Sequence, residues 1–271
     1  MTVELDRTVP GLFVGQEGAV LTLRLERAQR RNAIGDDMMA GLIEALDLAG
    51  RDDSVRAVYL EGAGGHFCGG ADIVARNAGI DGRPRPGAIQ RRLPSQAHRL
   101  IPLICEVQVP VVCAVRGWAA GIGLQLAAAA DFTVTATDAT FWAPFSERGF
   151  TPDSGATWLL PRLVGPVRAR ELLLLGRRLS GTEAAEWGLV HQAVAPDQVD
   201  TVARGLVDRL AAGPTVSLGL TKWLLHSGAA LPLDGQLRNE GFAMELSSRS
   251  EDFREGLGAF GERRSPDFKG R

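Results

Sequence analysis

Residues 144–158, PFSERGFTPDSGATW, place an acid, Asp153, directly after a proline and ahead of a predicted helix. An aspartate at such a position can cap the helix by accepting hydrogen bonds from the free N–H groups of its first turn. A carboxylate beside an apolar pocket can instead act as a general base that moves protons on a bound substrate. The residues alone favour the cap, and they leave the catalytic role open.

Two glycine-rich turns could supply a second kind of chemistry. His66–Asp72 reads HFCGGAD and Gly117–Gly123 reads GWAAGIG, and each joins a predicted strand to a predicted helix. Glycine permits a tight turn with free N–H groups, and two such groups directed at one oxygen form an oxyanion hole. Turns that serve packing alone are the competing interpretation. A nucleotide site is disfavoured, because neither turn spells G-x-G-x-x-G or a Walker loop.

The elements that must position these groups alternate along most of the chain. Hydrophobic patterning predicts strands at 20–25, 55–60, 111–115, 132–135 and 140–142. Helices are predicted from 36 or 37 to 46, at 97–107 with a kink or break at Pro102, at 124–130, after Asp153 and at 167–175. Strands alternating with helices predict an α/β fold with sheet layers packed against helices.

The last part of the chain is predicted to be helical, over 197–212, 215–227, 234–248 and 251–261. We therefore predict a core over residues 1–195, which holds the site, and a C-terminal helical region over residues 196–271. The segment 76–92 is rich in Gly, Pro and Arg. We expect it to be a mobile surface segment that helps to shape the pocket.

Composition excludes several classes of function. The 271 residues are 45% hydrophobic and carry a net charge of −2, so no strong field attracts nucleic acid or an anionic membrane. The first ten residues have no apolar signal region, and the richest apolar run, 118–130, is too short to span a membrane. Three cysteines and four scattered histidines lack metal-site spacing, which favours free thiols in the reducing cytoplasm.

Five segments, in order, resemble one known family. Phe67–Asp72 resembles the F-x-x-G-A-D signature of the crotonase superfamily (enoyl-CoA hydratase/isomerase). Residues 114–123, AVRGWAAGIG, resemble its second signature, A-V-x-G-x-A-x-G-x-G. The early R-x-x-x-x-N-A element and two later elements match Arg27–Ala33, Pro161–Gly165 and Pro266–Arg271. Because the likeness covers nearly the whole chain, it is more specific than either turn alone.

The resemblance implies a spiral of ββα units with a C-terminal helical part that trimerises, and therefore a homotrimer or homohexamer. It implies acyl-CoA substrates whose thioester oxygen is held by two backbone amides, which match Gly69 and Ile122. Family members often have glycine where this chain has Ile122. Coenzyme A is then part of the substrate, and no separate cofactor, metal, nucleic acid or membrane is expected.

Carried over residue by residue, the resemblance also predicts the groups that contact substrate. The first turn would contribute Gly70, Ala71 and Asp72, the last of which would also cap the following helix. The acyl group would face an apolar wall of Trp118, Trp142, Phe145 and Phe150. The phosphates of coenzyme A would meet the cations Arg27, Arg30 and Lys269.

The reaction is predicted from what the chain lacks. Hydratases of this family use two glutamates, and the matching positions hold Gln125 and Phe145, neither of which can transfer a proton. A P-D-x-G aspartate at Asp153 resembles that of isomerases acting on dienoyl-CoAs or ring-epoxide acyl-CoAs. We therefore favour an acyl-CoA isomerase with Asp153 as base and cap. A hydratase using Asp153, or a non-catalytic acyl-CoA-binding protein, is the alternative.

Overall fold

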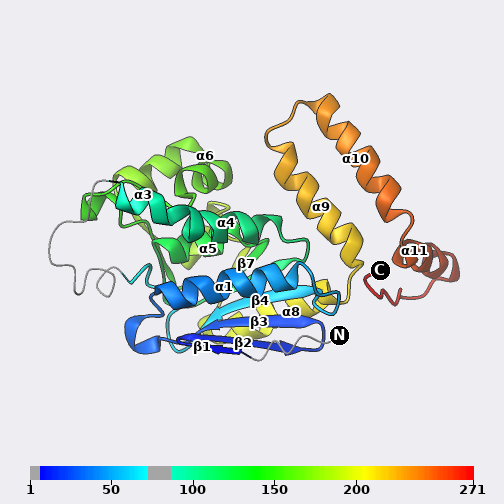
Figure 1. Cartoon of the computed structure of the whole chain (residues 1–271), viewed down its shortest axis with the longest axis horizontal. Coiled ribbons are helices and arrows are strands. Elements are labelled where there is room, and N and C mark those ends of the chain that lie inside the picture. Colours follow the sequence, from blue (N-terminus) through cyan, green and yellow to red (C-terminus); the bar gives the residue numbers. More distant parts are fainter. Residues whose placement is uncertain (1–6, 73–86) are drawn as a thin grey trace.

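The computed structural model describes residues 7–72 and 87–271, and its main sheet has seven strands in the spatial order β1-β2-β3-β4-β5-β7-β10 (Figure 1). The first three strands are antiparallel, and every later pair is parallel. The strands are β1 (Arg7–Val9), β2 (Leu12–Glu17), β3 (Val20–Leu25), β4 (Ala57–Gly62), β5 (Val111–Val115), β7 (Phe132–Ala136) and β10 (Gln192–Val194). The predicted strands at 20–25, 55–60, 111–115 and 132–135 are confirmed, the second shifted by two residues.

A second sheet joins β6 (Trp118–Ala120), β8 (Thr140–Trp142) and β9 (Arg178–Ser180). Here β6 pairs in parallel with β8, and β8 pairs antiparallel with β9. The predicted strand at 140–142 is confirmed. The second glycine turn differs from the prediction, because its residues Trp118–Ala120 form β6 instead of irregular chain.

Helices cover both faces of the main sheet. Helices α1 and α4 pack against each other on one face, and α8 packs on β3, β4, β5 and β7 from the other. The helices of the core are α1 (Asp36–Ala49), α3 (Ala88–Arg92), α4 (Ala97–Glu106), α5 (Ile122–Ala129), α6 (Ala156–Leu174), α7 (Gly181–Glu186) and α8 (Val199–Ala211). None of the helices in the described part of the chain combines the length and apolar character needed to cross a bilayer.

Helices α4 and α6 each contain a residue that can interrupt a helix, Pro102 in α4 and Gly165 in α6. Of the two outcomes predicted at Pro102, two shorter helices is wrong, since α4 runs through the proline as one helix, and a kink there stays a prediction. Burial of Leu100, Ile101 and Ile104 on one face outweighs the single hydrogen bond that proline removes. In α6 the break does occur, at Gly165 (φ 78°, ψ 163°), so the two predicted helical segments follow each other with a kink.

The C-terminal helices α9 (Thr215–Gly228), α10 (Leu233–Ser247) and α11 (Glu251–Glu262) form an arm beside the core (Figure 1). Arg56 attaches it, since its guanidinium donates to Gly213 O (2.6 Å), Thr215 Oγ1 (3.0 Å) and Phe268 O (3.2 Å). Helix α8 packs on the main sheet, so the arm beside the core begins at Thr215. The predicted division of the chain into 1–195 and 196–271 stays a prediction.

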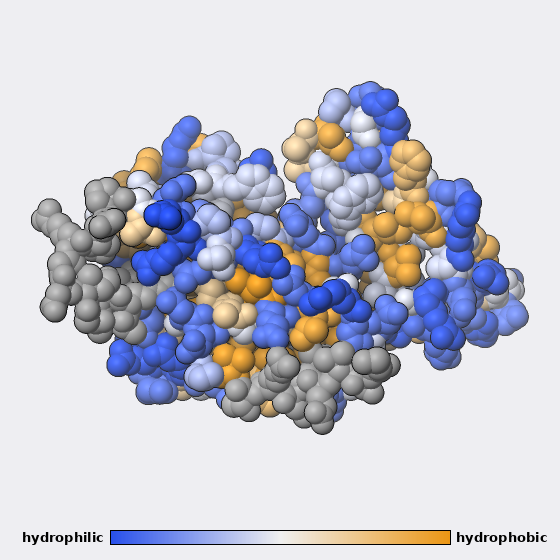
Figure 2. Space-filling model, in the orientation of Figure 1, coloured by the Kyte–Doolittle hydropathy of each residue, from blue (hydrophilic) through white to orange (hydrophobic). Residues whose placement is uncertain are grey.

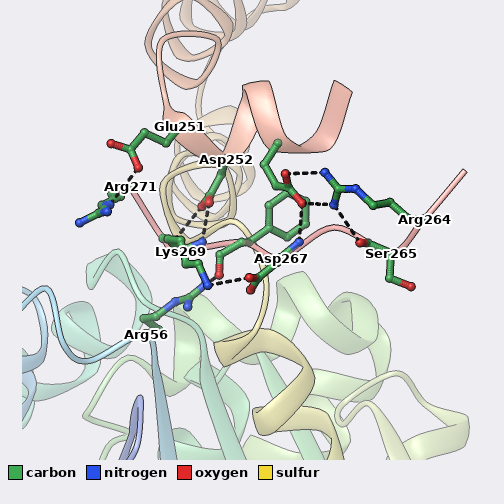
Figure 3. A network of polar contacts seen from close by, with 11 residues as sticks. Arg56, Glu251, Asp252, Arg264, Ser265, Asp267, Lys269 and Arg271 are labelled. Atoms are coloured by element: carbon green, nitrogen blue, oxygen red, sulfur yellow. Dashed lines mark hydrogen bonds and ion pairs between the residues drawn. The ribbon is translucent and has the colours of Figure 1, made fainter. Parts of the chain in front are cut away.

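The last residues of the chain are bound to α11 (Figure 3). The buried Asp252 carboxylate accepts from the N–H groups of Lys269 (2.6 Å) and Gly270 (2.8 Å). The Lys269 ammonium pairs with Asp267 at 2.7 Å. These bonds fix the C-terminal tail along the arm.

Candidate active site

The two glycine turns lie side by side because they follow neighbouring parallel strands. Strands β4 and β5 are hydrogen-bonded in parallel, so their carboxyl ends meet at one edge of the sheet. Beyond that edge the pairing continues between the turns. Cys68 N–H donates to Trp118 O (2.8 Å), and Ala120 N–H donates to Cys68 O (2.9 Å).

Glycines allow the start of α5 to touch the first turn. A Cβ on Gly123 would lie 2.6 Å from both Cβ and the carbonyl oxygen of Cys68, which is closer than side chains approach. Gly121 takes φ 52°, and a Cβ there would lie 3.6 Å from the Gly70 Cα. The positive end of the α5 dipole therefore faces the first turn directly.

The Gly69 amide is already engaged, which corrects the predicted donor pair. Its N–H donates to Arg31 O at 2.7 Å, so it cannot also hold a substrate oxygen with full strength. Ile122 is the first residue of α5, and its N–H has no intrahelical acceptor. In residues 7–72 and 87–271, the amides of Ala71 and Ile122 make no backbone hydrogen bond.

The bridge between Ile34 and Ala71 sets the direction of the Ala71 amide. Ile34 N–H donates to Gly70 O, and Asp72 N–H donates to Ile34 O, both at 2.9 Å. Along an extended segment successive N–H groups point to opposite sides, so the Ala71 N–H points away from Ile34. The first turn thus offers a free amide two residues after the predicted one.

A cavity of about 460 Å³ is lined by both turns and by Asp153. Its apolar lining includes side chains from four separate segments, among them Met39, Ile89, Leu93, Ala97, Ile122, Phe145 and Phe150. Its polar lining includes Arg92, Gln96, His98, Arg148, Thr151, Asp153 and Ser154. The structure thus brings the predicted acid and both turns together, although Asp153 lies more than 80 residues after the first turn.

Asp153 is half-buried, and the Ser154 hydroxyl donates to its Oδ1 at 2.9 Å. Ser154 (φ 53°) and Gly155 (φ 76°) are both left-handed, so the chain turns before α6 begins at Ala156. Gly155 occupies the cap position, and no side chain caps this helix. The predicted capping role of Asp153 is therefore wrong, and its carboxylate remains at the cavity.

The predicted aromatic wall is only half present. Phe145 and Phe150 line the cavity and meet edge to face, with ring centroids 5.6 Å apart. Trp118 and Trp142 are not among its lining residues, and they pair with each other on the small sheet at 5.8 Å. The Arg178 guanidinium lies 4.4 Å from the Trp142 ring centroid. Both indoles belong to the short second sheet, which the sequence did not reveal, and Arg148 links them to the cavity, since its guanidinium lies 5.5 Å from the Trp142 ring centroid.

The predicted phosphate-binding cations are not gathered at the cavity. Arg27 pairs with Asp72 at 2.8 Å and donates to Ala33 O at 2.8 Å, so it braces the first turn. Lys269 belongs to the C-terminal tail, and neither it nor Arg30 lines the cavity. Arg30 is exposed in the short 3-10 helix Ala28–Arg30, and its phosphate-binding role stays a prediction. The helix that Asp72 was predicted to cap lies outside the described residues.

The segment 76–92 was expected to shape the pocket. Residues 76–86 lie outside the described part of the chain. Residues 88–92 form α3, which contributes Ile89 and Arg92 to the cavity. Sequence reasoning missed Met39, Leu93 and Ala97 in the lining, because an apolar residue at a cavity has the same pattern as one in the core.

The positions that match the hydratase glutamates are both buried. Phe145 is 3% exposed and lines the cavity, while Gln125 is 0% exposed in α5. Cys68, next to the first turn, is fully buried, and burial raises the pKa of its thiol to about 12. The thiol is therefore not ionised near neutral pH, which agrees with its interpretation as a small buried residue.

The core of sheet layers and helices, with two turns over one cavity, agrees with the fold that the resemblance to the crotonase superfamily implied. Comparison with solved structures confirms this fold class. A putative enoyl-CoA hydratase from Streptomyces coelicolor A3(2) superimposes with a TM-score of 0.91 at 32% identity, covering 100% of this chain and 98% of that one.

Sequence comparison defines the family more closely. The model of the enoyl-CoA hydratase/isomerase family matches residues 15–271. A 1,2-epoxyphenylacetyl-CoA isomerase of Escherichia coli K12 is 41% identical, covering 94% of this chain and 97% of its own length. A probable enoyl-CoA hydratase of Rhodobacter capsulatus is 36% identical, covering 93% and 95%. The chain therefore belongs to the enoyl-CoA hydratase/isomerase family.

Proposed function

We propose that the protein is an acyl-CoA isomerase that moves a proton between carbons of an enoyl, dienoyl or ring-epoxide acyl group. The observation that supports it is that Ala71, Ile122 and Asp153 all line the same cavity. Two unbonded amides and one carboxylate are the minimum set for proton transfer next to a thioester carbonyl.

In the proposed mechanism the Ala71 and Ile122 amides hold the thioester oxygen. The Asp153 carboxylate removes a proton from one carbon of the acyl group, and the electron pair moves onto the carbonyl oxygen as an enolate. The two amides stabilise that charge, and loss of one donor typically costs about 10²–10³ in rate. Asp153 then returns the proton to another carbon, while the Ser154 hydroxyl keeps the carboxylate oriented.

Hydration is less well supported. Adding water across a double bond needs groups that deprotonate the water and protonate the carbon. Gln125 and Phe145 can do neither. The relative named as a 1,2-epoxyphenylacetyl-CoA isomerase favours isomerisation, while other relatives carry hydratase names.

Asp153→Asn tests the proposal against panels of enoyl-, dienoyl- and ring-epoxide acyl-CoAs. Turnover should fall by about 10²–10⁴, because the amide cannot accept a proton, while the Kd for the substrate changes little. Asp234→Asn, at the exposed start of α10, is the matched control and should keep full turnover. Unchanged turnover in Asp153→Asn would discard the role of the carboxylate. Hydration of an enoyl-CoA by the wild type would select the hydratase, and tight binding without turnover would select the non-catalytic alternative.

We also propose that the arm mediates self-association into a trimer or hexamer. Figure 2 shows apolar surface on the arm. Its large exposed side chains, all more than half accessible, include Leu225, Leu237, Phe242, Met244, Leu246, Leu257 and Phe260. Contiguous apolar surface of this kind marks association sites in soluble proteins. Sedimentation velocity of the wild type should give a species larger than the monomer, and a lone monomer would contradict the proposal.

The proposed reaction uses acyl-CoA alone. The proton and the electron pair both stay on the acyl group, so the chemistry is redox-neutral and the substrate carries the coenzyme A. Full turnover is expected from protein treated with chelator and freed of small molecules by dialysis.

A further inference from the structure

Lys222 is a buried cation on the arm. It lies in α9, is 7% exposed, and pairs with Asp131 at 2.7 Å. Its ammonium also donates to Ile104 O (2.8 Å) and Val109 O (3.3 Å), so its three N–H groups have three acceptors. The Asp131 carboxylate accepts in addition from the Val111 N–H at 2.7 Å. A buried ammonium without such partners would be costly, so these bonds fix α9 against the core at this point.

The partners of Lys222 lie at the far ends of elements whose near ends form the cavity. Asp131 follows the end of α5 by two residues, and Ile104 belongs to the last turn of α4. The first residues of these two helices, Ile122 and Ala97, line the cavity. A helix of eight residues is about 12 Å long, so the ion pair holds α5 at the end opposite its free amide.

The ion pair is the strongest polar contact just beyond that end of α5. Neutral donors also reach carbonyl oxygens of its last turn, from the Thr133 hydroxyl (2.7 Å) and the Cys105 thiol (3.9 Å). Hydrogen bonds that involve charged groups are roughly twice as strong as neutral ones. All residues of α5 are buried, and because apolar packing is non-directional, polar bonds at the ends of the helix set its position along its axis.

A second side chain of α9 contacts the acid side of the cavity. His226, one turn after Lys222, stacks on Trp158 of α6 with ring centroids 6.1 Å apart and an interplanar angle of 26°. Burial lowers the pKa of His226, so its imidazole is uncharged near neutral pH and packs as an aromatic ring. Trp158 lies in the first turn of α6, and its N–H donates to Gly155 O at 3.0 Å. The stack therefore holds the helix that Asp153 directly precedes.

We propose that Lys222 and His226 are positioning residues, through which α9 of the arm sets the Ile122 amide and the Asp153 carboxylate at a fixed separation across one cavity. Neither Lys222 nor His226 lines the cavity, so both act through the elements that they contact. The inference rests on the proposed function and extends it, because the arm then serves the site as well as carrying apolar surface.

The test for Lys222 is the absorption band of bound cinnamoyl-CoA, a conjugated thioester. Donors that polarise its carbonyl move the band to longer wavelength, so the band shift reports the two amides without any turnover. Lys222→Met keeps an unbranched side chain and removes the charge. The band shift at saturating protein should fall, and kcat should fall by about 10² while the Kd for the ester changes less, because a displacement of about 1 Å at a reacting group has an effect of that size.

Arg56→Met is the matched control, because Arg56 also joins the arm to the core through three hydrogen bonds. Those bonds reach the start of the arm and the C-terminal tail, and none of them reaches α4 or α5. The control should lose stability in urea and keep both its band shift and its kcat. If Lys222→Met does not fold, the double change Lys222→Met/Asp131→Asn removes both charges, leaves no unpaired buried ion, and should show the same loss of band shift.

The test for His226 separates the acid from the amides. His226→Leu loses the stacked ring, so the start of α6 and the acid before it should move. Turnover should fall by about tenfold or more, while the cinnamoyl-CoA band shift stays at the wild-type value. The control His191→Leu removes an edge-to-face contact with Phe132 (5.1 Å), and because neither of these residues lines the cavity it should change neither quantity.

Equal losses of band shift and kcat in Lys222→Met and Arg56→Met would overturn the inference, because loosening the arm at any point would then be sufficient. An unchanged band shift in Lys222→Met, or an unchanged kcat in His226→Leu, would overturn it as well. Failure of the proposed function gives a different result. Unchanged turnover in Asp153→Asn would discard the isomerase, while the band shift in Lys222→Met would still decide whether α9 positions the amides.

Discussion

Gly123 offers a direct test of whether close contact between the two turns creates the site. The residue lies in α5, one position after Ile122, and packs on Cys68 of the first turn. Replacing it with alanine adds one methyl group at the contact between the turns. Neither the charge of the cavity nor any side chain that lines it is altered.

The expected displacement follows from the distances. The new Cβ would lie 2.6 Å from Cβ and the carbonyl oxygen of Cys68, about 0.8 Å short of ordinary contact at 3.4 Å. Both partners are held by backbone hydrogen bonds between the turns, so the strain must move the start of α5. A shift of about 1 Å at a reacting group can cost about 10² in rate. Overpacking should also lower the free energy of unfolding by about 1–3 kcal/mol.

The assay measures kcat/KM on the best acyl-CoA of the panel together with urea unfolding. Gly205→Ala is the matched control, because Gly205 lies in α8 with open space around it. That control should keep its kcat/KM and gain about 0.5–1 kcal/mol in the free energy of unfolding, as alanine favours the helix. Gly123→Ala should lose about 10² in kcat/KM while its KM changes less.

One result would refute this reasoning. If Gly123→Ala kept kcat/KM within about threefold of the wild type while folding normally, the relative position of the two turns would not govern catalysis. The Ala71 and Ile122 amides would then not act as a geometric pair. A Gly123→Ala protein that is less stable but turns over substrate at the wild-type rate would also contradict the claim that the two amides act as a pair.

Arg27→Met should lower the free energy of unfolding by about 2 kcal/mol, because it leaves the carboxylate of Asp72, which is only 5% exposed, without its ion-pair partner. The control Arg238→Met breaks an exposed pair with Asp234 and should lower the free energy of unfolding by about 0.5 kcal/mol or less. Equal losses in urea unfolding would contradict a bracing role for Arg27. Cys68 should resist iodoacetamide in the native protein at about pH 8, because burial raises the pKa of its thiol to about 12, and it should react after unfolding. Mass spectrometry locates the label, and native labelling at the rate of a free thiol would show that the turn opens.

Local patterns predicted most elements correctly. Period-two alternation at 20–25 and the apolar run at 111–115 are strands, and the four C-terminal helices lie within a few residues of their predicted bounds. Such elements depend on contacts within a short window, so the sequence carries their signal directly. The predictions failed where packing outweighed the local signal, as with the two shorter helices at Pro102, or where strands far apart in the chain pair, as in the small sheet.

The candidate site shows the same division. The sequence determined that the chain has two glycine turns, an acid after a proline, and no glutamate at the two hydratase positions. Only the tertiary structure decided which amide of the first turn is free, because the Gly69 N–H is taken by Arg31, which lies 38 positions earlier in the chain. It also placed the two indoles in the small sheet and outside the cavity lining, paired Arg27 with Asp72, and removed the helix-capping role of Asp153.

The physical reason is one of range. Residue type and spacing fix what a group can do, such as donate, accept or transfer a proton. Whether the group is available depends on partners that folding brings from distant segments, and those partners have no signature near the residue itself. The sequence therefore determined the family and the inventory of chemical groups, and the fold decided which of them face the cavity with a hydrogen bond still to make.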